Sequence, residues 1–147
     1  MKPLVSVVIP TYNSRSTIDR TLKSVREQTF RDYEIIVVDD GSKDGTREFL
    51  QAQKDIRTEF QNNQGAGPAR NTGVRKSSGK YIAFLDADDE WHPRKLELQL
   101  EVAKKVQKFG IISNEIKEVI EGRDDQREKW VGQRPLLPRK LRVFNFY

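Results

Sequence analysis

Short apolar runs alternate with amphipathic segments along the first hundred residues of this chain. The runs are rich in β-branched residues and are followed at once by proline or aspartate, a pattern typical of strands. It predicts strands at residues 4–9, 34–38 and 80–85, with a weaker candidate at residues 56–60. We expect the first strand to stop at Pro10, because proline cannot donate to a strand ladder.

Apolar residues at helical spacing lie between these strands. Ile18, Leu22 and Val25 recur at i, i+4 and i+7, and Ser16 with Asp19 three residues later resembles a capping box at the start of that helix. Further helices are predicted at residues 46–53, 68–78 and 93–109, and residues 111–112 begin one more strand. Strands alternating with helices predict an α/β fold with a mainly parallel sheet and helices on both faces.

Polar clusters follow three of the predicted strands, at residues 11–13, 39–42 and 86–88. Parallel sheets bind ligands beyond the carboxyl ends of their strands, so we expect these clusters to converge on one crevice. Side chains alternate along a strand, which predicts that Asp86 and Asp88 point to the same side and Ala87 to the other. Two such carboxylates repel each other unless a cation compensates, and Mg²⁺ or Mn²⁺ is commonly held by one or two carboxylates plus substrate phosphates. The alternative is an ordinary helix cap, with Asp89 before Pro93.

Composition narrows the function classes. The 147 residues suffice for one domain with a real core, and all of the net charge of +5 falls in residues 91–147. The chain has no cysteine and one histidine, His92, which excludes disulfides, thiolate metal sites, cysteine nucleophiles and multi-histidine zinc sites. No apolar run is long enough for a membrane span or a signal peptide, so we expect a cytoplasmic protein.

The sequence does not match several common functional motifs, because the required residues or spacings are absent. A phosphate-binding P-loop needs four residues between its glycines, whereas Gly73 and Gly79 have five between them. No G-x-G-x-x-G follows the first strand, and an EF-hand beginning at Asp40 would end on Gln51 where a bidentate glutamate is required. No G-x-S-x-G elbow supports a serine hydrolase.

Four other motifs, in order and at ordinary spacing, resemble the family 2 glycosyltransferases from about residue 5 to about residue 100. They are VSVVIPTYN at residues 5–13, VVDDGS with DGT at residues 37–46, NQG with ARNTG at residues 63–73, and YIAFLDADD at residues 81–89. The resemblance implies a truncated GT-A fold, a Rossmann-like fold of nucleotide-diphospho-sugar transferases. It also implies metal-dependent transfer of a sugar, with inversion, from a nucleotide diphosphate sugar, expected to be a UDP-sugar, to an acceptor hydroxyl.

The resemblance also assigns roles to individual residues. It implies that Asp40 accepts a hydrogen bond from the base and that Arg70 adds positive charge at the diphosphate. The nucleotide pocket would be lined by Pro10, Thr11, Tyr12 and Asn13. In the D-x-D motif Asp86 would lie near the ribose and the metal, and Asp88 would be the direct ligand of Mn²⁺ or Mg²⁺. The implied acceptor is a saccharide or a lipid-linked saccharide, in polysaccharide biosynthesis at the cell envelope, with peripheral membrane contact.

The chain departs from the family pattern after the D-x-D motif. Residues 1–122 are predicted to be the nucleotide-sugar-binding domain, and residues 123–147 a basic segment that begins a missing acceptor half. The general base is therefore expected beyond Tyr147, and no catalytic residue is named. Apolar surface left uncovered near residues 111–120 would favour self-association.

Two other functions stay open at this point. The chain is alternatively a truncated fragment that binds nucleotide sugar and metal without turnover. Less favoured is a basic module for nucleic acid or anionic membranes, using Trp130, Phe144, Phe146 and Tyr147; under the leading interpretation nucleic acid is not a partner. Local alternatives also remain: a plain turn for residues 11–13, an Asx-turn for Asp39 and Asp40, and a solvated or Asp-paired Arg70.

Overall fold

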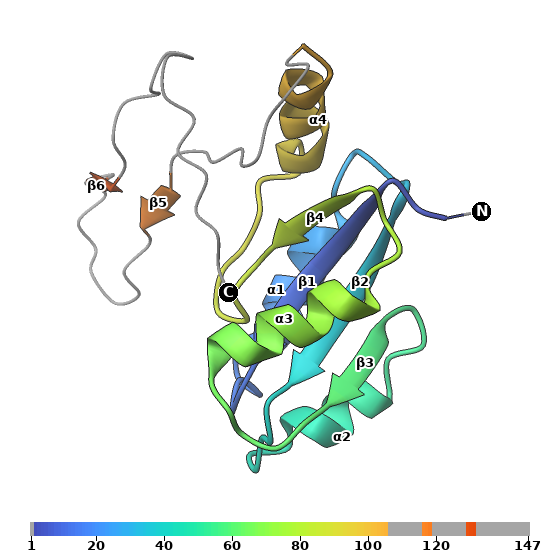
Figure 1. Ribbon diagram of the computed structural model, residues 1–147. Coiled ribbons are helices and arrows are strands. Elements are labelled where there is room, and N and C mark those ends of the chain that lie inside the picture. The colour runs from blue at the N-terminus through green and yellow to red at the C-terminus, as the bar shows by residue number, and fades with distance from the viewer. Residues whose placement is uncertain (1, 106–115, 119–128, 132–147) are drawn as a thin grey trace. The chain divides into compact units, whose positions relative to one another are not determined.

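A four-stranded sheet forms the centre of the compact unit Met1–Leu98 in the computed structural model, which describes residues 2–105, 116–118 and 129–131 (Figure 1). Its strands are β1 (Val5–Thr11), β2 (Tyr33–Asp39), β3 (Arg57–Phe60) and β4 (Tyr81–Phe84), in the order β3-β2-β1-β4. All three pairings are parallel. The predicted α/β fold with a parallel sheet is therefore confirmed, including the weak strand candidate that became β3.

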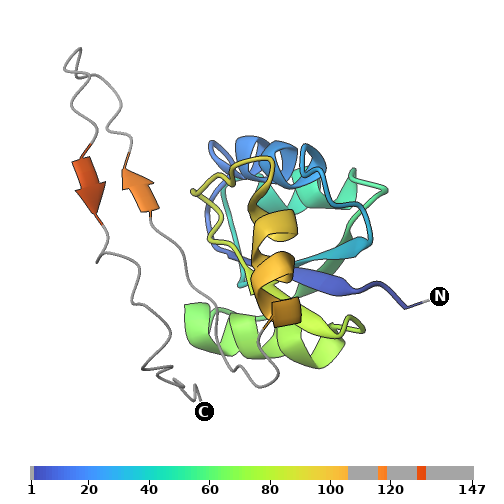
Figure 2. The same cartoon turned by 90° about the horizontal axis from the view of Figure 1, so that it is seen from above.

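Helices cover both faces of this sheet. Helices α1 (Ile18–Arg26) and α2 (Thr46–Gln51) lie on one face and α3 (Ala66–Lys76) lies on the other (Figure 2). The strand residues of β1 are all buried, as are Ile18, Leu22 and Val25 of α1. A Cβ atom on Gly73 would lie 2.3 Å from Cγ1 of Val8, so α3 approaches β1 at a distance that requires glycine.

Strand β1 continues through Pro10 to Thr11, so the expectation that it stops at Pro10 was wrong. The hydrogen bonds of β1 alternate between its two neighbours: the Val8 carbonyl accepts from Leu85 on the β4 side, and the Thr11 carbonyl accepts from Asp40 on the β2 side. Pro10 therefore faces the β4 side, where the paired register has already ended at Phe84. The missing N–H of the proline therefore removes no hydrogen bond between β1 and β4.

Three helix starts also differ from expectation. The N-cap of α1 is Thr17 and not Ser16, and no side-chain cap bond is present; instead the carbonyl of Ser14 accepts from the backbone of Thr17 and Ile18. Helix α3 begins two residues before Pro68, which is tolerated because the first turn of a helix lacks internal N–H partners. Helix α4 (Lys95–Lys105) begins two residues after Pro93, its predicted start.

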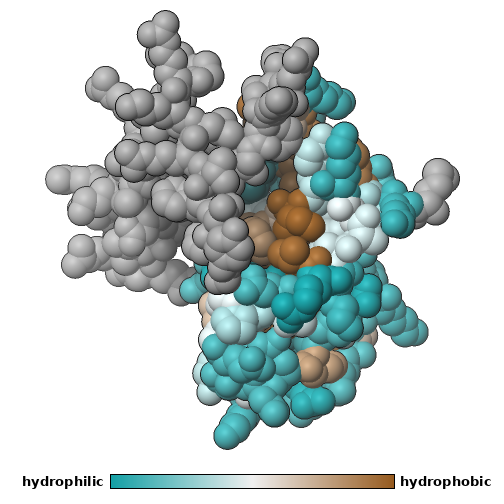
Figure 3. Space-filling model, in the orientation of Figure 1, coloured by the Kyte–Doolittle hydropathy of each residue, from teal (hydrophilic) through white to brown (hydrophobic). Residues whose placement is uncertain are grey.

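The face shown in Figure 3 is mostly hydrophilic, with an apolar patch near its centre. The exposed large apolar side chains of the described residues include Val74 of α3 and Ile82 and Phe84 of β4. Within the part of the chain that the structure describes, no helix is both long and apolar enough to cross a membrane.

The second compact unit, Gln99–Tyr147, contains an antiparallel pair of short strands, β5 (Ile116–Glu118) and β6 (Lys129–Val131). Several expectations fall outside the described residues: the strand at residues 111–112, the domain boundary after residue 122, and the aromatic residues 144, 146 and 147. The self-association surface near residues 111–120 is likewise outside them, apart from the backbone of β5.

Candidate functional site

A cavity of about 710 Å³ opens at the carboxyl ends of β1, β2 and β4. The predicted convergence of the polar clusters on one crevice is therefore confirmed. Among the residues that line it are all eight predicted from the sequence: Pro10, Thr11, Tyr12, Asn13, Asp40, Arg70, Asp86 and Asp88. Residues from the loop before α3, including Asn63 and Gly65, complete the wall.

The loop after β1 is fastened to the loop after β2. The backbone N–H of Asn13 donates to Ser42 Oγ at 2.8 Å, and the side-chain oxygen of Asn13 accepts from the N–H of Lys43 at 2.8 Å. Asn13 itself has a left-handed backbone, with φ of 49°, a conformation that asparagine tolerates better than most residues. This reciprocal pair holds the loop in place while the side chain of Tyr12 stays 48% exposed at the cavity.

Asp44 supports the same junction. Its carboxylate accepts from the N–H of Arg15 at 2.9 Å and from the N–H of Thr46 at 3.1 Å. Desolvation alone would raise the pKa of Asp44, but these bonds and one from the Thr46 hydroxyl outweigh it and leave the pKa below its ordinary value. Asp44 therefore stays charged and joins the two loops.

The two adjacent aspartates at the end of β2 point to different partners. Asp39 accepts from the N–H and the hydroxyl of Ser42, so the Asx-turn interpretation describes Asp39. The other carboxylate oxygen of Asp39 and the hydroxyl of Thr11 are buried without a hydrogen-bond partner among the described residues. Asp40 turns instead toward the loop that precedes α3.

Asp40 is 3% exposed, and its carboxylate accepts hydrogen bonds from three donors. The Gln61 side-chain amide donates at 2.7 Å, the Gln64 N–H reaches both oxygens at 3.0 and 3.1 Å, and the Gly65 N–H donates at 2.7 Å. Gly65 has φ of 95°, which only glycine adopts readily and which brings the last N–H toward the carboxylate. A carboxylate has about four acceptor positions. Because the Gln64 N–H is shared between both oxygens, three protons serve these positions, and the carboxylate can accept a fourth donor from a ligand.

Asp86 and Asp88 lie in a turn after β4 and not on the strand, because β4 ends at Phe84 and the Asp89 N–H donates to the Asp86 carbonyl at 3.1 Å. The alternation argument was therefore wrong in its cause. Asp86 and Asp88 are nonetheless both exposed at the cavity, and Ala87 between them is buried although it also lines the cavity.

Helix α1 holds the segment that contains this turn, a role that the sequence analysis missed. The Thr21 hydroxyl donates to the Ala87 carbonyl at 2.9 Å, and Ser24 Oγ accepts from the Trp91 N–H at 3.0 Å. The fully buried Gln28 donates to the His92 carbonyl at 2.8 Å and accepts from the Leu96 N–H at 3.0 Å. Gln28 lies two residues beyond the end of α1, so the only signal was the spacing of Thr21 and Ser24 at i and i+3, beside the apolar stripe of the helix.

The electrostatics of this turn suit a cation. Desolvation, followed by the negative charges of Asp88 and Asp86, raises the pKa of Asp89. Arg70 forms an ion pair with Asp86, so of the alternatives for Arg70 the structure shows the Asp-paired one.

No group of three or more histidine, cysteine, aspartate or glutamate residues that could hold a metal occurs within the described ranges. Asp86 and Asp88 can thus supply only part of a coordination shell. This donor set fits Mg²⁺ or Mn²⁺ that takes its remaining ligands from substrate phosphates and water.

Comparison with known proteins gives a consistent result. The family model described as Glycosyl transferase family 2 matches residues 6–146. TuaG of Bacillus subtilis (strain 168), a glycosyltransferase named for teichuronic acid biosynthesis, is 47% identical over 105 residues, covering 68% of this chain and 42% of TuaG. WfgD of Escherichia coli, named as a UDP-Glc:alpha-D-GlcNAc-diphosphoundecaprenol beta-1,3-glucosyltransferase, is 42% identical over 105 residues, covering 69% of this chain and 42% of WfgD. The chain thus spans less than half the length of these relatives.

Solved structures share the fold. S. aureus TarS 1-349 in complex with UDP aligns with a TM-score of 0.65 and 28% identity, covering 71% of this chain and 32% of that one. The mannosyltransferase PcManGT from Pyrobaculum calidifontis, in complex with GDP-Man and Mn²⁺, aligns with a TM-score of 0.61 and 28% identity, covering 75% of this chain and 34% of that one. These are GT-A-like neighbours, and the expected fold class is confirmed.

Proposed function

Because the chain belongs to glycosyl transferase family 2, we propose that its cavity binds the nucleotide of a UDP-sugar for metal-dependent, inverting transfer of the sugar to an acceptor hydroxyl. The observation that carries the proposal is the convergence of Tyr12, Asp40, Asp86 and Asp88 on one cavity. Asp40 follows β2 and the other two aspartates follow β4, with β1 between them in the sheet. This separation gives the base and the diphosphate different ends of the site.

Asp40 and Tyr12 hold the base in this proposal. Uracil presents one ring N–H, which can be the fourth donor to the Asp40 carboxylate beside the three N–H groups of the protein. The half-exposed Tyr12 ring offers an aromatic face for stacking. The UDP complex of TarS and the UDP-Glc in the name of WfgD support a uridine donor, whereas the GDP-Man complex of PcManGT makes guanine the alternative to test.

The diphosphate lies at the turn after β4. Asp86 and Asp88 would hold a divalent cation there, and Arg70 gives up part of its pairing with Asp86 to meet the phosphate oxygens. Such a cation would supply positive charge to stabilise the departing diphosphate. The Mn²⁺ complex of PcManGT supports this part of the proposal.

The acceptor is a saccharide, in a lipid-linked form and in the synthesis of a cell-envelope polysaccharide. The names of TuaG and WfgD support this assignment. A lipid-linked acceptor would bring the protein to a membrane surface from the cytoplasm. No described residue is assigned as the general base.

Calorimetry of the full 147-residue chain tests the proposal. We expect UDP to bind with Mn²⁺ or Mg²⁺ present, to bind much more weakly with EDTA, and to bind more tightly than GDP. Asp88→Asn removes the metal dependence, while Asp32→Asn, an exposed aspartate outside the cavity, leaves it intact. Metal-independent UDP binding, or equal affinity in the Asp88→Asn variant, contradicts the proposal.

A further inference from the structure

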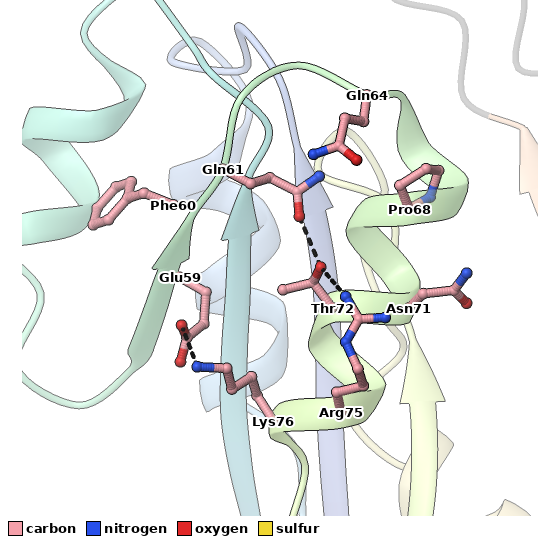
Figure 4. Close-up of a pocket in the computed structure, with 9 residues that line it drawn as sticks. All are labelled: Glu59, Phe60, Gln61, Gln64, Pro68, Asn71, Thr72, Arg75 and Lys76. Carbon is pink, nitrogen blue, oxygen red and sulfur yellow. Dashed lines mark hydrogen bonds and ion pairs between the residues drawn. The ribbon is translucent and has the colours of Figure 1, made fainter.

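A second cavity of about 460 Å³ lies between β3 and α3, and it contains polar side chains that reach toward Asp40. Figure 4 shows Gln61, from the end of β3, pointing to Thr72 on α3, with Arg75 one turn further along the helix. Arg75 donates to Thr72 Oγ1 at 2.8 Å, and the Thr72 hydroxyl donates to Gln61 Oε1 at 2.8 Å. The amide nitrogen of Gln61 then donates to Asp40 at 2.7 Å.

The direction of this chain of hydrogen bonds is fixed at both ends. A guanidinium can only donate, so the Thr72 oxygen accepts from Arg75 and its single proton goes to Gln61. A carboxylate can only accept, so the Gln61 amide must present its NH₂ group to Asp40. A cation and an anion thus terminate the series, and each bond polarises the next.

The contact on Asp40 comes from a side chain that does not line the nucleotide cavity. The other two donors to this carboxylate are backbone N–H groups of Gln64 and Gly65, which substitution does not remove. Among the described residues, Gln61 is therefore the one donor to Asp40 that an amino-acid substitution can remove. Without it, one oxygen of Asp40 keeps only the N–H that Gln64 shares between both oxygens, so the carboxylate is held less firmly against rotation about its Cβ–Cγ bond.

We propose that Gln61 is a positioning residue that, oriented by Thr72 and Arg75, holds the Asp40 carboxylate so that one acceptor position faces the base of the bound nucleotide. This rests on the proposed function, since it takes Asp40 as the group that contacts the base. Gln61 acts through Asp40 and touches neither the nucleotide nor the metal. The consequence is that selectivity for uridine depends on residues behind the nucleotide cavity.

The test compares UDP with inorganic diphosphate, both with Mn²⁺, by calorimetry on the full chain. Gln61→Met keeps the length of the side chain and removes the amide; we expect about a tenfold loss of UDP affinity and no change for diphosphate. Thr72→Val, which removes the hydroxyl that orients Gln61, changes UDP affinity in the same direction by a smaller factor. Gln51→Met, an exposed glutamine on α2, is the control for the substitution itself.

A double-mutant cycle separates positioning from general structural damage. In the Asp40→Ala background, Gln61→Met causes no further loss of UDP affinity if it acts through Asp40. Equal losses for UDP and diphosphate, or additive losses in the double variant, overturn the inference while leaving the proposed function standing. Absence of UDP binding by the unsubstituted chain overturns both. A thermal midpoint for each variant shows whether the fold is retained.

Discussion

The hydroxyl of Thr21, in the middle of α1, donates a 2.9 Å hydrogen bond to the carbonyl oxygen of Ala87, between the two exposed aspartates of the turn after β4. Thr21 has no exposed surface, so water cannot replace this bond if the hydroxyl is lost. The position of the carboxylate pair is therefore set by a residue 66 positions away in the sequence.

Thr21→Val keeps the shape of the side chain and removes this donor. The buried Ala87 carbonyl is then left unsatisfied, which we expect to lower the free energy of unfolding by about 1–3 kcal/mol. Because the turn also loses its anchor, the Mn²⁺-dependent part of UDP affinity falls several-fold. Urea unfolding and calorimetry measure the two effects. Thr58→Val in β3, outside the cavity, is the control, and a loss of stability without any change in metal dependence would limit Thr21 to a structural role.

Asp40→Ala removes the acceptor for three donors and the contact proposed for the base. We expect uridine nucleotides to lose at least tenfold in affinity and inorganic diphosphate to change little, because only the former has a base to hold. The N–H groups of Gln64 and Gly65 lose their partner, so the thermal midpoint also falls. Equal losses for both ligands in calorimetry would make Asp40 a loop-supporting residue only.

Arg70→Met separates two effects of the ion pair with Asp86. The pair is partly exposed, so its loss changes stability little. Without nucleotide, Asp86 is no longer paired with the Arg70 guanidinium, so we expect Mn²⁺ to bind more tightly. With nucleotide, the diphosphate loses the guanidinium as a charged donor, so we expect UDP to bind several-fold more weakly. Titrating Mn²⁺ alone and then UDP with saturating Mn²⁺ measures the two changes, and a fall in both affinities contradicts the assignment.

Lys95 gives the protein a specific pH dependence. Its Nζ lies 4.3 Å from the centre of the Trp91 ring, and burial lowers its pKa from 10.5 to about 8. Between these two values the unfolded chain holds a proton on Lys95 that the folded chain has lost, so this group makes the free energy of unfolding rise with pH. Below about pH 8 Lys95 is charged in the folded chain as well, and burial of the charged amine lowers the free energy of unfolding by its full amount.

Lys95→Met removes that dependence. The free energy of unfolding of the variant minus that of the unsubstituted chain is expected to be largest at pH 7. This difference falls steadily as the pH approaches 10.5. Urea unfolding at several pH values measures the difference, with Lys54→Met at an exposed position as the control. A difference in the free energy of unfolding that stays constant across this pH range would contradict the prediction.

Local patterns in the sequence predicted the strands and helices of the first unit because β-branched runs and helical spacing reflect burial directly. The error at Pro10 came from tertiary context, because the proline is accommodated where β4, distant in the sequence, has ended beside it. The error at the start of α1 is local: Thr17 replaces Ser16 as the cap because the carbonyl of the nearby Ser14 already closes the first turn.

The same distinction applies to the site. Residues that line the cavity were predictable because they follow strands in motifs, as Asp40 and Asp88 do. Residues that hold them in place were not, because Thr21 and Gln61 contact partners whose distance in the sequence is 66 and 21 positions. Such pairs become visible only when the sheet order is known.

The fastening of Asn13 to Ser42 and Lys43 has a kinetic meaning. Both loops that form this wall of the cavity are already ordered by hydrogen bonds within the protein, so a nucleotide bound as proposed would not have to bring them together. Association would then approach that of a rigid receptor, with little conformational entropy lost on binding. Differences in affinity among nucleotides would arise mainly from how fast each one leaves.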